Sequence, residues 1–107
     1  MPEFRIAKIS DVPAGQAKVF KAGDHQIVLC NVNGEFYAIQ DRCTHDDGPL
    51  GDGELWDEII ECPRHGAQFN VKTGAVVTLP AVLPIATYPV KVEGNDIKVI
   101  VNGQTKQ

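Results

Sequence analysis

Two short stretches of this chain each place a cysteine close to a histidine: CTH, from Cys43 to His45, and CPRH, from Cys62 to His65. Two thiolates and two neutral imidazoles suit zinc, or an iron–sulfur cluster in which histidines replace two cysteines. In the common zinc finger both cysteines precede both histidines, whereas each stretch here carries one of each. Two similar loops can meet tip to tip, with the cysteines on one side and the histidines on the other, which suits two adjacent metals better than one. The fold must therefore hold together two loops that are distant in sequence.

The segments outside these stretches are typical of a β protein. Apolar and polar residues alternate over short segments separated by turn residues, and no segment has an amphipathic pattern of helix length. Asn33-Gly34 is a dipeptide that supplies the two positive φ angles of a type I′ hairpin. Prolines at 80, 84 and 89 mark a connection or a sheet edge, because proline cannot donate to a central ladder. The expected strands are one around Phe4 and Ile6, then 16–22, 26–32, 35–40 and 85–92, and a last one with Ile97, Val99 and Val101 on one face.

The middle of the chain has a different composition. From Asp41 to about Thr78, glycine, proline and acidic residues dominate, with short apolar islands at Ile59-Ile60 and around Phe69. We expect one domain, 1–107, in which a loop-rich subdomain of about 41–78 is inserted in a β framework of 1–40 and 79–107. Function should reside in the insert, because binding residues concentrate on loops that a rigid scaffold positions.

Composition excludes several classes of function. A chain of 107 residues is one domain's worth of sequence, and its net charge of −4 argues against nucleic acid, which requires a basic surface. No stretch is long and apolar enough to span a membrane, and the charged start of the chain does not resemble a signal peptide. We therefore expect a cytoplasmic protein with no membrane partner, in which the three cysteines are thiols or metal ligands rather than disulfide partners.

The double Cys/His pattern, with GPLGDG at 48–53 and FNVKTG at 69–74, resembles the Rieske iron–sulfur proteins. Within them it is similar to the small soluble Rieske ferredoxins, the ferredoxin components of bacterial multicomponent aromatic-ring-hydroxylating dioxygenase systems. The resemblance covers nearly the whole chain and implies the Rieske fold, an antiparallel β-sandwich framework with a loop-rich cluster-binding subdomain. It also implies one [2Fe-2S] cluster per chain, with Cys43 and Cys62 on one iron and His45 and His65 on the other.

The function implied by the resemblance is one-electron transfer. The partners would be a flavoprotein, the ferredoxin reductase, and a terminal oxygenase, with the chain itself a monomer and not an enzyme. An oxygenase would need a further iron held by two histidines and a carboxylate, and only His25 remains beside the cluster histidines. No catalytic residue is expected, and no GxGxxG dinucleotide site is present. The alternatives are a Rieske-like small subunit of nitrite reductase and a structural zinc-binding module.

Departures from the family's pattern predict a low reduction potential. Membrane-complex Rieske proteins carry an extra, disulfide-forming cysteine in each loop, and Gly48 and Arg64 occupy those places here. Their second loop also carries a serine and a tyrosine that bond to cluster sulfur, where this chain has Ala67 and Phe69. Without these hydroxyl bonds the oxidised cluster is favoured, so we expect a potential of about −150 mV, at the low end of the Rieske range.

Other residues have more ordinary interpretations. Cys30 is expected to be a buried small hydrophobe, and His25 an exposed residue beside a turn. Trp56 should pack over the segment between the two ligand pairs, and Phe69 should form a wall of the cluster pocket. Arg64 should face solvent beside the cluster.

The segment between the two ligand pairs is acidic. It is either a solvated loop or a docking surface for basic partners, where complementary charge raises the association rate. Its acidic residues are Asp46, Asp47, Asp52, Glu54, Asp57, Glu58 and Glu61.

Overall fold

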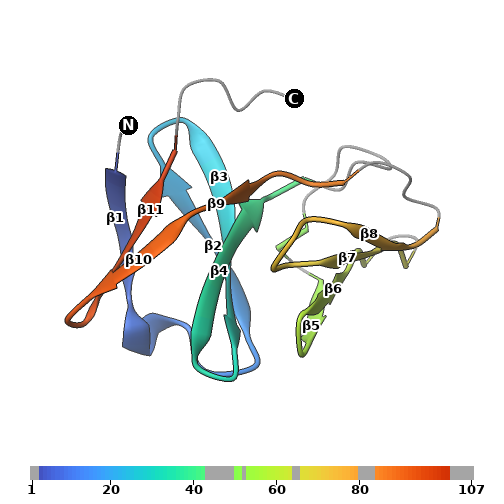
Figure 1. The fold of residues 1–107 in the computed structure, drawn as a ribbon, viewed down its shortest axis with the longest axis horizontal. Helices are drawn as coiled ribbons and strands as arrows, with labels where there is room; N and C mark the ends of the chain where they lie inside the picture. The colour runs from blue at the N-terminus through green and yellow to red at the C-terminus, as the bar shows by residue number, and fades with distance from the viewer. Residues whose placement is uncertain (1–2, 43–49, 52, 64–65, 80–83, 102–107) are drawn as a thin grey trace.

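Three antiparallel sheets form the computed structural model, which describes residues 3–42, 50–51, 53–63, 66–79 and 84–101. Their strand orders are β1-β11-β10, β2-β3-β4-β9 and β5-β6-β7-β8 (Figure 1). The all-β prediction is confirmed. The elements are β1 (Glu3–Lys8), the 3₁₀ turn η1 (Ile9–Asp11), β2 (Ala17–Ala22), β3 (His25–Val32), β4 (Glu35–Gln40), β5 (Glu54–Trp56), β6 (Ile59–Glu61), β7 (Gln68–Asn70), β8 (Val76–Thr78), β9 (Thr87–Tyr88), β10 (Val90–Glu93) and β11 (Asp96–Ile100).

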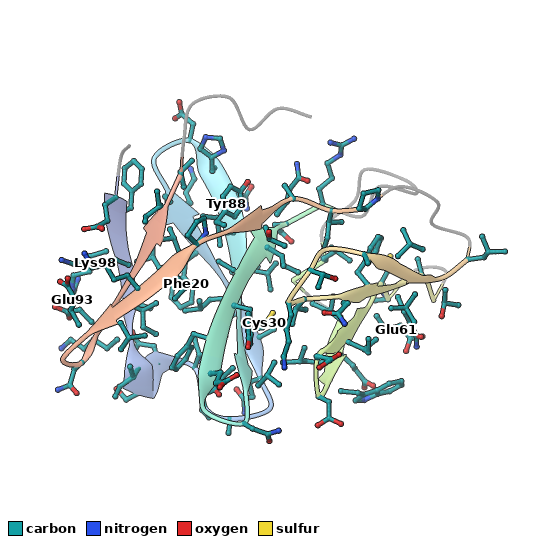
Figure 2. The ribbon with its side chains drawn as sticks, in the orientation of Figure 1. Phe20, Cys30, Glu61, Tyr88, Glu93 and Lys98 are labelled. Carbon is teal, nitrogen blue, oxygen red and sulfur yellow. The ribbon has the colours of Figure 1, made fainter. Side chains whose placement is uncertain are left out.

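In the sheet β2-β3-β4-β9, called the central sheet below, strand β3 is buried on both faces from Ile27 onward. Ile27 and Leu29 of β3 belong to one core with Ile97 of β11, whereas Val28 and Cys30 belong to a second core with buried residues of β6 and β7. Figure 2 shows the Cys30 sulfur between the central sheet and the sheet β5-β6-β7-β8. A strand covered on both faces is apolar at every position, which explains why β3 reads as a continuous apolar run instead of alternating.

The β3–β4 hairpin forms at the dipeptide that the sequence marks for it. Asn33 has a φ of 53° and Gly34 a φ of 93°, which confirms the two positive φ angles expected there. The turn is fixed by Asn31, whose Nδ2 donates to the Val12 carbonyl at 2.7 Å and whose Oδ1 accepts from the Gly34 amide at 2.8 Å. Asn31 is buried, so these bonds also satisfy its polar atoms.

The insert contains more regular structure than its composition predicts. Strands β5 to β8, each three residues long, pair antiparallel in a sheet of their own, called the cluster sheet below. Three positions are too few to display the alternation that reveals a strand in sequence, and glycine, proline and acidic residues surround them. Only Ile60 and Phe69, at the centres of β6 and β7, are fully buried there, and they are cross-strand partners.

The two ends of the chain meet in one sheet. Strand β1 pairs with β11, and β10 pairs with the other side of β11. Ile97, Val99 and Val101 are all buried, as the alternation in the last segment predicts. Pro89 lies between β9 and β10, which are edge strands of different sheets, so the prediction that it marks an edge is confirmed. Pro80 lies outside the described residues.

No helix in the described ranges is long and apolar enough to cross a bilayer.

Candidate metal centre

Of the four predicted metal ligands, the structure describes one. Cys62 directly follows β6 and is buried, with a relative exposure of 1%. Cys43, His45 and His65 lie outside the described residues, as does Arg64.

Cys62 stands at the base of a tight loop that closes on itself. Its amide donates to the Ala67 carbonyl at 2.7 Å, and its carbonyl accepts from the Gly66 amide at 3.1 Å. Gly66 has a φ of +78°, in the left-handed region that a residue with a side chain rarely adopts. The CPRHG sequence is therefore held as a closed loop by backbone bonds at its two ends.

A pocket of about 330 Å³ opens beside this loop, lined by Glu54, Glu61, Cys62, Pro63 and Gly66. Glu54 and Glu61 face each other across the β5–β6 pair. The rim of the pocket therefore carries two like charges in direct cross-strand register, an arrangement that destabilises a sheet. Figure 2 shows Glu61 on the cluster sheet, at the opposite side of the molecule from Glu93.

The wall behind Cys62 is apolar. Ala67 and Phe69 are fully buried and share a core with Cys62, Leu50 and Ile60. Phe69 lies in this core and does not itself line the pocket, so its place as a wall of the cluster pocket stays a prediction. A buried thiol with an apolar wall on one side and an open pocket on the other fits an iron–sulfur cluster, whose sulfur ligands are soft and whose solvent access the protein must limit.

Cys30 is equally buried but is a different kind of cysteine. Its side chain is fully enclosed in the core between the central sheet and the cluster sheet, and burial raises the pKa of its thiol to about 12. A metal ligand must be a thiolate, and a thiol with this pKa stays protonated at neutral pH. The prediction that Cys30 is a small hydrophobe is confirmed.

Two predictions about other side chains are wrong. His25 is not fully exposed, because it lies in β3 and its ring meets the Tyr88 ring edge-on, with centroids 6.3 Å apart. Trp56 does not pack over the acidic segment, because it stands at the β5–β6 turn with 54% of its surface exposed. The turn that follows Trp56 has a positive φ of 54° at Asp57.

Sequence reasoning missed the role of Asp41. Its Oδ1 accepts from the amides of Leu50 and Gly51, both at 2.8 Å, and so joins the two sides of the segment that contains Cys43 and His45. An aspartate two positions before the first ligand cysteine was the available signal. Its partners are nine and ten residues further along the chain, and no local pattern connects them.

Comparison with known proteins decides what this arrangement is. The family described as "Rieske [2Fe-2S] domain" matches residues 3–89. The chain belongs to the Rieske family. Its cofactor is therefore a Rieske-type [2Fe-2S] cluster, and a structural zinc module is excluded.

Two curated relatives of this Rieske protein are ferredoxins of dioxygenase systems. The chain is 49% identical over 98 residues to the 3-phenylpropionate/cinnamic acid dioxygenase ferredoxin subunit of Escherichia coli K12, covering 91% of this chain and 92% of the relative. It is 42% identical over 99 residues to the ferredoxin component of biphenyl 2,3-dioxygenase from Rhodococcus jostii RHA1, covering 92% of each. Both relatives are named as the ferredoxin of a dioxygenase and not as its oxygenase.

Solved structures of related ferredoxins have the same fold as this chain. The ferredoxin of carbazole 1,9a-dioxygenase from Nocardioides aromaticivorans IC177 superimposes with a TM-score of 0.88 at 33% identity, covering 92% of this chain and 97% of that one. A chain in the complex of reduced oxygenase and oxidised ferredoxin of carbazole 1,9a-dioxygenase gives a TM-score of 0.85 at 32% identity, covering 91% of each. The Rieske fold expected from the sequence is confirmed.

Proposed function

We propose that this chain is a one-electron carrier that receives an electron from a flavin-dependent ferredoxin reductase and passes it to a terminal oxygenase acting on aromatic rings. The observation that carries the proposal is the similarity, over more than nine-tenths of the chain, to ferredoxins of aromatic dioxygenase systems. The structure of a related ferredoxin with its oxygenase supports the second half of the transfer.

The proposed ligands are Cys43 and Cys62 for one iron and His45 and His65 for the other. The cluster supplies one-electron storage when bound. The burial of Cys62 beside a pocket, and the raised pKa that removes Cys30 from consideration, support this set. The chain's own contribution is to shield the Cys62 thiolate from water on the apolar side formed with Ala67 and Phe69. No residue of the chain is proposed to be catalytic.

We further propose that the chain acts as a cytoplasmic monomer. Its single domain would consist of the framework 1–40 and 79–107 with the cluster-binding subdomain at about 41–78. The separate pairing of β5 to β8 supports this division, since no strand of the cluster sheet pairs with a strand of the other two sheets within the described residues.

The test is a transfer experiment with the dithionite-reduced holoprotein, freed of excess reductant. We expect the oxidised terminal oxygenase of the 3-phenylpropionate dioxygenase system to take up one electron per chain, followed by the cluster absorbance in a stopped-flow instrument. If the protein instead purified with a tightly bound nitrite reductase subunit and gave no electron to the oxygenase, the proposal would be wrong.

The acidic rim of the pocket predicts a salt-dependent reaction with the oxygenase. Charge complementarity mainly raises association rates and is screened by salt, so the second-order rate should fall by roughly tenfold between low and high ionic strength. Glu54→Gln should slow the low-salt reaction by about threefold. Glu93→Gln is the matched control, because Glu93 lies at the far side of the molecule, ion-paired to Lys98 at 2.7 Å. Equal rates for the two variants would contradict docking at this rim.

Ala67 predicts how the potential can be raised. The residue is fully buried in the second ligand loop, where it offers no hydroxyl to the cluster. We expect Ala67→Ser to raise the potential by about 40 mV, the one-electron equivalent of a hydrogen bond worth about 1 kcal/mol. Ala75→Ser, at an exposed position, is the control and should leave the potential unchanged. A redox titration of the three proteins checks this, and a lowered or unchanged potential in Ala67→Ser would refute it.

A further inference from the structure

We propose that Asp41 is a positioning residue that holds Leu50 and Gly51, where the chain returns from the first ligand stretch, in place against the second ligand loop. The inference rests on the proposed ligand set, since it assigns Asp41 a role toward Cys43 and His45. The carboxylate Oδ1 of Asp41 accepts two amide bonds at once, from Leu50 and Gly51, each at 2.8 Å. Because one oxygen accepts both bonds, a single side chain joins both ends of the segment.

Both ends of this closed loop are seated on the central sheet. The Asp41 amide donates to the Gln26 carbonyl of β3 at 3.1 Å. At the other end, Gly51 lies directly against Val19 of β2, and a Cβ at position 51 would overlap the Val19 side chain. The carboxylate of Asp41 therefore connects two points that the framework already holds.

The closed loop also contacts the second ligand loop. The Gly53 amide donates to the Leu50 carbonyl at 2.9 Å, which turns the chain immediately after the Asp41 bonds. A Cβ at Gly53 would overlap the backbone carbonyl of Glu61, the residue before Cys62. The return of the first loop thus lies against Glu61, directly before Cys62.

The ends of the two ligand loops are joined by different kinds of hydrogen bond because the loops differ in length. The second loop is short enough to close with backbone bonds between Cys62, Gly66 and Ala67. The first runs from Asp41 to Gly51, and a longer loop loses more entropy when its ends are held together. A fixed carboxylate with two amide bonds supplies the closure that the backbone supplies in the second loop.

The test compares substitutions that separate the geometry of Asp41 from its charge. Asp41→Asn keeps an oxygen at the same place without the charge, and Asp41→Glu keeps the charge but moves the oxygens by one methylene. We expect the dithionite-reduced holoprotein of Asp41→Glu, and of Asp41→Ala, to lose iron to a ferrous chelator about tenfold faster than reduced wild type. Asp41→Asn should stay within about threefold of wild type.

The second readout is spectroscopic. Misplaced ligands change the visible circular dichroism and the g values of the reduced cluster, so Asp41→Glu should shift both and Asp41→Asn neither. Asp11→Ala is the matched control, because it removes a carboxylate-to-amide bond of 2.9 Å to Lys8 in the framework. It should leave the release rate and both spectra unchanged.

The outcomes separate the two proposals. Wild-type release and spectra in both Asp41→Glu and Asp41→Ala would overturn the role of Asp41 while leaving the electron carrier intact. If Asp41→Asn were as impaired as Asp41→Glu, charge and not loop closure would be responsible, which would also overturn it. A wild-type protein that bound no cluster would instead contradict the proposed function.

Discussion

We expect the replacement of Cys62 with alanine to abolish the cluster, and the replacement of Cys30 with alanine to leave it in place. The two residues form a matched pair, because both are free cysteines with relative exposures of 1% and 0% and both belong to the same core. Each substitution removes one sulfur atom from a buried position. They differ in that Cys62 borders the pocket beside the second loop, whereas the enclosed Cys30 thiol has a pKa of about 12.

The measurement is iron and acid-labile sulfide per chain in anaerobically purified protein. We expect wild-type content in Cys30→Ala and essentially none in Cys62→Ala. The histidines allow a parallel comparison, since His65→Ala should lose the cluster and His25→Ala, which alters only a ring contact with Tyr88, should retain it. A full cluster in Cys62→Ala, or its loss in Cys30→Ala, would show that the ligand set is wrong.

Replacing Phe69 with alanine destabilises the protein by roughly 3–5 kcal/mol. Phe69 lies at the centre of β7, is fully buried and is among the largest side chains in the core between the central sheet and the cluster sheet. Its removal takes apolar surface out of the contact and leaves a cavity, and both effects lower the free energy of unfolding.

The control is Val77→Ala on the neighbouring strand β8, where the side chain is 49% exposed. Substitution there should change the free energy of unfolding by no more than about 0.5 kcal/mol. Urea unfolding of both variants measures the difference. A loss in Phe69→Ala no larger than in Val77→Ala would mean that Phe69 does not tie the cluster sheet to the framework.

Local chemistry made part of this structure predictable from sequence. The Asn33-Gly34 dipeptide specifies its hairpin because few residues tolerate a positive φ. Strand β4 begins at the next residue, so the dipeptide also marks the start of that strand. The alternation of Ile97 and Val99 reveals a strand with one buried face. The paired Cys/His stretches point to a metal centre because ligand chemistry restricts residue type and spacing.

The remainder depends on contacts that no local pattern records. The strands of the cluster sheet are three residues long, so their pairing is set by neighbours and not by propensity. The run from Ile27 to Cys30 is apolar because two separate layers cover β3, and a sequence shows the run without showing the layers. Asp41 bonds to amides nine and ten positions away, and nothing in the local sequence shows that Trp56 is exposed.

The most direct test of the account is metal and acid-labile sulfide analysis of anaerobically purified protein, together with its low-temperature paramagnetic resonance spectrum after dithionite reduction. The account predicts irons and sulfides in a one-to-one ratio, two of each per chain, and a rhombic signal of low average g from a cluster with mixed cysteine and histidine ligation. One zinc per chain with no paramagnetic signal would contradict it.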